Sequence, residues 1–175
     1  MAITSLSNPG TGKSSSTSVT APASIAAGDL LIYFDDSITS GSPPAQVTPT
    51  GFTEIKYQSG SASMSGALYY KIADGTESST SFSGMTGTYA NRKMLCHFSP
   101  DEPITGVTVQ SLVYEATQGN PTTKTITASS GAAPLVLIAT WANGIDGNSV
   151  SPRTQSPAFT EISNTTHQYL GWKFY

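Results

Sequence analysis

The stretch Leu30-Leu31-Ile32-Tyr33-Phe34 is typical of a buried strand, and it returns in similar form as Leu137-Ile138-Ala139-Thr140-Trp141. A short, continuous apolar run of this kind is expected for a strand in a sheet core. Its neighbours return with it, and three of the four segments share one offset of 107 residues. The pairs are 18–21 with 125–128, 30–34 with 137–141, 52–55 with 159–162 and, after a shorter loop, 68–72 with 170–174. The chain therefore contains an internal repeat, approximately residues 18–72 and 125–174.

The repeat predicts the architecture. Two copies are too few for a solenoid or a propeller, since such arrays need about three or more. Two related halves built of strands suit a double-sheet fold made of two Greek keys. Turn signals recur roughly every 8 to 15 residues, the spacing of sandwiches and barrels, with further strands expected at 92–98, 107–114 and 122–128. We therefore predict an all-β fold, an antiparallel β-sandwich or jelly roll built from two related Greek-key halves.

The length of 175 residues fits one domain with a sizeable core. Residues 1–16 are rich in Gly, Ser and Thr, so we expect a flexible arm or an edge strand there, and we expect residues 7–16 to be mobile until a partner orders them. We expect residues 17–175 to form a single β-sandwich domain. Within it, strict alternation over 52–57 predicts Phe52, Glu54 and Lys56 on one side of a strand, and Thr53, Ile55 and Tyr57 on the other.

Charge and composition exclude several functions. Only 11% of residues are charged, and 8 Lys and Arg against 11 Asp and Glu give a net charge of −3. The chain has no basic footprint for phosphates, so nucleic-acid binding is disfavoured. No apolar run is long enough to span a membrane. Residues 1–5 lack the basic and apolar regions of a secretory signal, so we expect synthesis in a cytoplasm. A single cysteine, Cys96, excludes an intramolecular disulfide.

The segment from Ser7 to Ser14 resembles a phosphate-binding P-loop in its Gly12-Lys13-Ser14 ending. The motif requires a glycine where Ser7 stands, and it requires a strand before it and a helix after it. Neither flank has the required pattern. A flexible arm is therefore the better interpretation.

The remaining reactive side chains do not form a catalytic pattern. His97 and His167 are the only histidines, too few for a zinc site. Cys96 and His97 are adjacent, so on a strand they point to opposite faces, with Cys96 in the core. Two carboxylates could in principle cleave glycosides. The available acids are Asp35-Asp36, which we expect to begin a loop, Asp101-Glu102, Glu115 and Asp146; Glu54 and Glu161 match within the repeat and are expected to be structural.

Binding sites are equally scarce. Residues 143–148 contain alternating oxygen ligands, but too few carboxylates for calcium, and turn chemistry explains them better. Asn164-Thr165-Thr166 is a glycosylation sequon that matters only on a secretory route. Aromatic residues could stack sugars if exposed, although in strands they usually pack in cores. These residues are Tyr33, Tyr57, Tyr69, Tyr70, Trp141, Tyr169, Trp172 and Tyr175. We expect no catalytic residue, no cofactor and no metal.

Three segments of the first 80 residues or so together resemble a known domain. They are Ala27-Gly28-Asp29-Leu30-Leu31-Ile32, then Pro49-Thr50-Gly51-Phe52-Thr53, then 69–77, Tyr-Tyr-Lys-Ile-Ala-Asp-Gly-Thr-Glu. In this order they are similar to a β-sandwich domain of tailed-bacteriophage virion proteins. Residues 92–104 match its next strand and loop only loosely, with Cys96-His97-Phe98 in place of a more usual Tyr-Arg-Gly. The second half matches through the internal repeat.

The resemblance implies a virion structural protein rather than an enzyme. Such domains occur in head decoration proteins, head fibres and tail appendages. It implies a decoration, or cement, protein on the capsid exterior that bridges major capsid subunits, itself a homo-oligomer and by analogy a trimer. The alternative is a head or tail fibre module that binds host surface glycan.

Overall fold

The computed structural model describes residues 6–59, 63–107, 135–141, 160–164 and 168–174. All regular structure in these ranges is β, every strand pairing is antiparallel, and no helix occurs among them. The predicted all-β antiparallel class is therefore confirmed. The predicted strands at 107–114 and 122–128 and the turn pairs 143–144 and 146–147 lie outside the described residues, apart from Val107.

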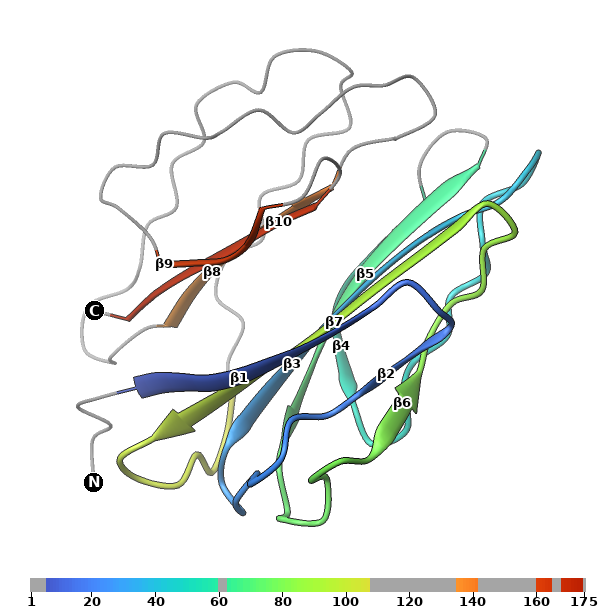
Figure 1. The fold of residues 1–175 in the computed structure, drawn as a ribbon. Helices are drawn as coiled ribbons and strands as arrows, with labels where there is room; N and C mark the ends of the chain where they lie inside the picture. Colours follow the sequence, from blue (N-terminus) through green and yellow to red (C-terminus); the bar gives the residue numbers. More distant parts are fainter. Residues whose placement is uncertain (1–5, 60–62, 108–134, 142–159, 165–167, 175) are drawn as a thin grey trace.

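The strands form three sheets (Figure 1). The largest has five strands in the order β1 (Leu6–Ser14), β7 (Ala90–Pro100), β3 (Leu30–Ile38), β5 (Met64–Ile72) and β4 (Thr53–Ser59). The second has three, in the order β8 (Leu135–Trp141), β10 (Gln168–Phe174) and β9 (Thr160–Asn164). The third is a ribbon of β2 (Ser18–Thr20) and β6 (Ser81–Ser83).

The internal repeat is visible in the strand order. The first copy is arranged β3-β5-β4 and the second β8-β10-β9, so residues 30–34 and 137–141 lie in equivalent strands, as predicted. Thr53 pairs with Tyr70 in the first copy, and the equivalent Thr160 pairs with Trp172 in the second. Equivalence thus extends to the register of the outer strand pair.

A β-bulge interrupts both outer pairs at the same place. The register shifts between Glu54 and Lys56 in β4, and again between Leu170 and Gly171 in β10, opposite the matching part of β9. One extra residue in a strand moves the following side chains to the other face. The strict alternation expected over 52–57 is therefore wrong: Phe52 and Tyr57 pack on the same core, whereas Ile55 packs on the opposite one.

The centre of the five-stranded sheet is buried on both faces, whereas the residues of the edge strand β4 are exposed or half-buried. All nine residues of β3 are buried. One face carries a cluster that includes Leu31, Tyr33, Phe52, Tyr69, Phe82 and Leu95, with edge-to-face ring contacts of Tyr33 and Phe82 to Phe52. The other face carries Leu30, Ile32, Phe34, Met94, Cys96 and Phe98. Burial on two faces explains why the sequence of β3 begins as a continuous apolar run.

The segment expected to be a flexible arm or an edge strand is strand β1 at the edge of the sheet. It pairs with β7 from Leu6–Pro100 to Ser14–Lys93, with an irregularity between Ser7 and Gly10. Its P-loop-like sequence is therefore extended and hydrogen-bonded. A Cβ on Gly12 would lie 2.3 Å from the carbonyl oxygen of Thr20, so glycine allows β2 to approach β1 closely.

Candidate functional site

The polar centre of the sheet lies where a loop was expected. Asp35 and Asp36 do not follow the core strand but lie within β3, which continues to Ile38. The expectation was wrong because β3 has partners on both sides over this length: β5 and β7 both pair with it to Ile38. Both aspartates are fully buried. Buried acids in a central strand require compensating partners.

The partners come from β7, directly across the ladder. Asp35 is the register partner of Lys93, and Asp36 is the register partner of Arg92. Lys93 Nζ contacts Asp35 Oδ1, and both side chains are entirely inaccessible to solvent. Arg92 Nη1 donates to Asp36 Oδ2 at 2.7 Å on the opposite face of the strand. Two adjacent acids therefore face two adjacent bases.

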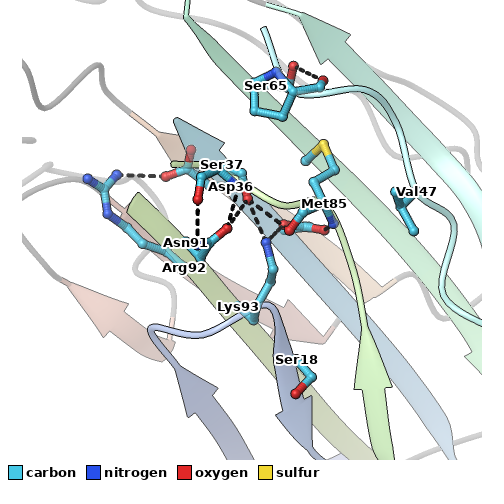
Figure 2. Close-up of polar contacts among 12 residues, drawn as sticks. Ser18, Asp36, Ser37, Val47, Ser65, Met85, Asn91, Arg92 and Lys93 are labelled. Carbon is cyan, nitrogen blue, oxygen red and sulfur yellow. Dashed lines mark hydrogen bonds and ion pairs between the residues drawn. The ribbon is translucent and has the colours of Figure 1, made fainter. Parts of the chain in front are cut away.

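A loop closes over the Asp35–Lys93 pair. Lys93 Nζ also donates to Ser37 Oγ at 2.7 Å, and the backbone N–H of Met85 donates to Asp35 Oδ2 at 2.7 Å. Ser37 Oγ in turn contacts the Met85 carbonyl at 3.3 Å and Asn91 Oδ1 at 3.1 Å. Figure 2 shows Lys93, Ser37, Met85 and Asn91 converging on one point, while Arg92 reaches Asp36 separately. We call Asp35, Ser37, Met85, Asn91 and Lys93 the lysine cluster.

Asn91 ties the loop between β6 and β7 to this cluster. Its Oδ1 accepts the N–H of Gly87 at 2.7 Å, and its Nδ2 donates to the Gly87 carbonyl at 3.0 Å. A Cβ on Gly84 would lie 2.0 Å from Asp35 Oδ2 and 2.5 Å from the Tyr33 hydroxyl. Glycine at position 84 is therefore required for the loop backbone to reach the carboxyl group.

Burial pushes the lysine cluster toward its uncharged forms. Desolvation raises the pKa of Asp35, against the opposing effects of Lys93 and of the Met85 amide. Desolvation likewise lowers the pKa of Lys93, against the attraction of Asp35. The pKa of the Tyr33 phenol is raised by burial and then by Asp35. The Tyr33 hydroxyl is buried without a hydrogen-bond partner in the described part of the chain. The arrangement brings together an amine, a carboxyl group and a protonated phenol in a site whose side chains are buried from solvent.

Asp36 is less completely compensated. Burial raises its pKa to about 6, although Arg92 and, more weakly, Lys93 act to lower it. Its Oδ1 atom has no hydrogen-bond partner within the described ranges. An acid in this state favours protonation in the folded protein more than in the unfolded chain.

A third polar group lies at the other end of β3 and β7. His97 Nε2 and Asp29 Oδ2 are 2.6 Å apart, and Ser99 Oγ donates to Asp29 Oδ1 at 3.1 Å. The serine thus contacts the aspartate rather than the histidine, which is not the arrangement of a nucleophile with its base. Cys96 lies in the core cluster on the opposite face, as the alternation predicted. Asp29 Oδ2 also accepts the N–H of Ala26 at 2.8 Å, so the group fixes the start of β3.

Each segment that carries the phage resemblance contains residues that support a turn. Gly28 has a φ of 88°, and a Cβ there would collide with Pro103 at 2.4 Å. Gly51 has a φ of 80°. Glu77 accepts the N–H groups of Asp74 at 3.1 Å and Gly75 at 3.0 Å, and it pairs with Lys71 at 2.7 Å. Burial alone would raise the pKa of Glu77, but the hydrogen bonds from Lys71 and Asp74 lower it.

The other candidate residues are dispersed. Glu54 and Asp101 are exposed, and Glu102 is half-buried. Among the aromatic residues considered for sugars, Tyr33 and Tyr69 are fully buried and Tyr57 and Tyr70 are packed against the two cores. His167, Glu115, Asp146, the 143–148 loop and Tyr175 lie outside the described residues, as does most of the sequon at 164–166. The side chains of Trp141, Glu161, Tyr169 and Trp172 are not described either.

Sequence reasoning missed two features. Tyr89 is the aromatic side chain that the described residues leave most open, 70% exposed beside β7. The lysine cluster had a usable signal, an Asp-Asp pair in one strand and an Arg-Lys pair in another, but its recognition required the register. No group of three or more His, Cys, Asp or Glu gathers in the described ranges in a way that could hold a metal. These ranges also contain no helix long and apolar enough to cross a membrane.

The chain was compared with protein-family models, curated proteins and solved structures, and no match was found in any of the three.

Proposed function

We propose that this protein is a structural component of a bacteriophage virion, a decoration protein that binds the capsid exterior and bridges major capsid subunits. The observation that carries the proposal is the role of the resembling segments. Gly28, Asp29, Gly51 and Glu77 each support a turn or the start of a strand. A likeness made of scaffold residues supports a shared scaffold function rather than shared chemistry.

The distribution of charge also supports a scaffold. Four ionic side chains, Asp35, Asp36, Arg92 and Lys93, are used between β3 and β7 in a chain with only 11% charged residues. Few charged side chains are therefore left for the surface, so a contact with a partner would depend only weakly on salt. Few charges on a sheet edge also leave it suited to pairing with another chain. We expect the edge strand β1 to take part in assembly. By analogy with the resembling decoration proteins, we expect the assembly to be a trimer.

For the complete fold we propose a sandwich of two facing sheets, with the Greek-key or jelly-roll topology of the resembling domains. The burial of every residue of β3 supports two covered faces. The matching strand orders β3-β5-β4 and β8-β10-β9 support an origin in two related halves.

The alternative is a fibre or receptor-binding module for host glycan, and one residue favours it. Tyr89 is 70% exposed. Thr88, next to it, accepts the Ser40 N–H through its hydroxyl at 3.4 Å, so loops after β3 and β6 meet there. Exposed aromatic rings among hydroxyl groups are suited to stacking on sugars. A Tyr89→Ala variant would abolish adsorption under this alternative and leave it unchanged under the decoration proposal.

Deletion of the gene from the phage that encodes it separates the two functions. A decoration protein stabilises the shell that it binds, by about several kcal/mol when binding is tight. Capsids without it should assemble but release DNA at a lower temperature or under a milder osmotic shock. Adsorption to cells should be normal. Particles of normal heat stability that fail to adsorb would overturn the decoration proposal and support the glycan-binding one.

A further inference from the structure

We propose that Lys93 and Asp35 become joined by an amide bond between Nζ and Cγ, an internal cross-link between β7 and β3. The inference does not depend on the proposed virion function. It starts from position: the two residues are register partners on adjacent antiparallel strands, and Nζ contacts Oδ1. Two groups held in contact react far faster than the same groups free in solution.

The second step is the protonation state of the pair. A reactive amine must be neutral, and a carboxyl group loses oxygen as water only when protonated. Desolvation lowers the pKa of Lys93 and raises the pKa of Asp35, so burial favours both reactive forms. Transfer of one proton from the ammonium group to the carboxylate produces them from the ion pair. Neither side chain has any access to solvent.

The third step is stabilisation of the intermediate. Attack of Nζ on Cγ places negative charge on the carboxyl oxygen that remains. The Met85 N–H already donates to Oδ2 at 2.7 Å. The Tyr33 hydroxyl, which has no hydrogen-bond partner among the described residues, lies in the same region, since a Cβ at position 84 would meet both oxygens. Donors arranged in advance around such an oxygen lower the barrier to acyl transfer. Ser37 Oγ accepts a hydrogen bond from Nζ at 2.7 Å and acts as a positioning residue.

The reaction balances without any co-reactant. The bond from Cγ to Oδ1 breaks as the bond from Nζ to Cγ forms. Oδ1 leaves as water, with its own hydrogen and one of the two amine hydrogens, and the amide keeps the other. No electrons are transferred. The absence of solvent at the site then protects the amide from hydrolysis.

The mass of the denatured, full-length protein tests the proposal. We expect the wild-type chain to be lighter than its sequence by one water molecule, after allowance for removal of Met1. Protease digestion followed by fragment-ion sequencing should give one branched peptide joining positions 35 and 93. A wild-type mass equal to that of the sequence overturns the proposal.

Peptide mapping and two variants distinguish the proposed amide from other sources of the same mass change. Asp74-Gly75 and Asp146-Gly147 could also lose water as cyclic imides, so a loss mapped to either pair overturns the proposal. In Lys93→Arg the charge remains but the amide cannot form, and the chain should keep its full mass. In Asp35→Asn the same bond forms with loss of ammonia, so the joined variant and the joined wild type should have identical masses. If Asp35→Asn does not fold, the wild-type mass and peptide map still decide.

Discussion

The two copies of the repeat share a frame but differ in what they bury. Both have a middle strand between two antiparallel neighbours, and both have the bulge at the same place. In the first copy β3 pairs with β5 along nine residues and includes Asp35 and Asp36. At the same offset, the second copy has Ala142 and Asn143 in the sequence, just beyond the end of β8. The buried acids are thus particular to the first copy.

The registers differ as well. In the first copy Leu30 pairs with Ile72. By the repeat, the equivalent pair in the second copy would be Leu137 with Phe174. Phe174 instead pairs with Leu135, two residues earlier in β8. A displacement of two residues keeps every side chain on its face, so the repeat tolerates it. The two copies therefore share the bulge and the register of the outer strand pairs, β4 with β5 and β9 with β10. The register of the other pairs, β3 with β5 and β8 with β10, differs between the copies. In the first copy β3 also pairs with β7, which supplies Arg92 and Lys93.

Removal of the base from the lysine cluster should have the largest effect. Lys93→Met leaves the carboxyl group of Asp35 buried without its partner and also prevents the proposed amide bond, so it should cost at least about 3–5 kcal/mol of unfolding free energy. Lys56→Met, the same change on a half-buried residue of β4, should cost about 0.5 kcal/mol or less. Urea unfolding of both variants measures the difference. Equal losses of unfolding free energy in the two variants would mean that the lysine cluster contributes no special stability to the first copy.

The second-largest expected effect is a dependence of stability on pH, caused by the raised pKa of Asp36. Its pKa is about 6 when folded and 3.8 in the unfolded chain, so the folded state binds the proton more tightly. Its contribution to stability is therefore fully present below pH 3.8 and is lost as the pH rises to about 6. The loss amounts to about 3 kcal/mol. Asp36→Asn removes this dependence, so the stability of wild type relative to Asp36→Asn should fall across this window. A constant difference would contradict the assignment.

Gly84→Ala should disturb the contact between the loop and β3. The new Cβ would meet Asp35 Oδ2 and the Tyr33 hydroxyl, so a shift of the backbone should cost about 2–3 kcal/mol. Gly106→Ala is the control, because a Cβ there meets nothing within 4 Å. Thermal melting compares the two variants, and a stable Gly84→Ala protein would show that the loop is free to move.

The bulge tests what the copies have in common. Ile55 lies between the shifted residues Glu54 and Lys56 and packs against a core cluster while partly buried. Ile55→Ala should cost about 1 kcal/mol, less than the full loss of a buried isoleucine. The repeat predicts a similar cost for Ile162→Ala, at the matching position. Urea unfolding of the two variants measures these costs. A large difference between them would mean that the two copies share only their strand order and not the packing at the bulge.

Much of the frame could be predicted from the sequence. The common offset of 107 residues identified equivalent strands, because β-strands repeat their apolar runs when a unit is duplicated. The bulge could not be predicted, since one inserted residue has no signature of its own in Phe52 to Tyr57. The buried acids were misplaced for a related reason. Propensity favours Asp in turns. Only pairing on both sides keeps Asp35 and Asp36 in a strand.

The sequence alone determined the all-β class and the duplication, since these depend on local preferences and on periodicity. Tertiary structure decided which charges meet. Asp35 and Lys93 are 58 positions apart, and only the β3–β7 register makes them neighbours. It also decided their protonation, because a pKa in a core depends on the water excluded by segments from all over the chain.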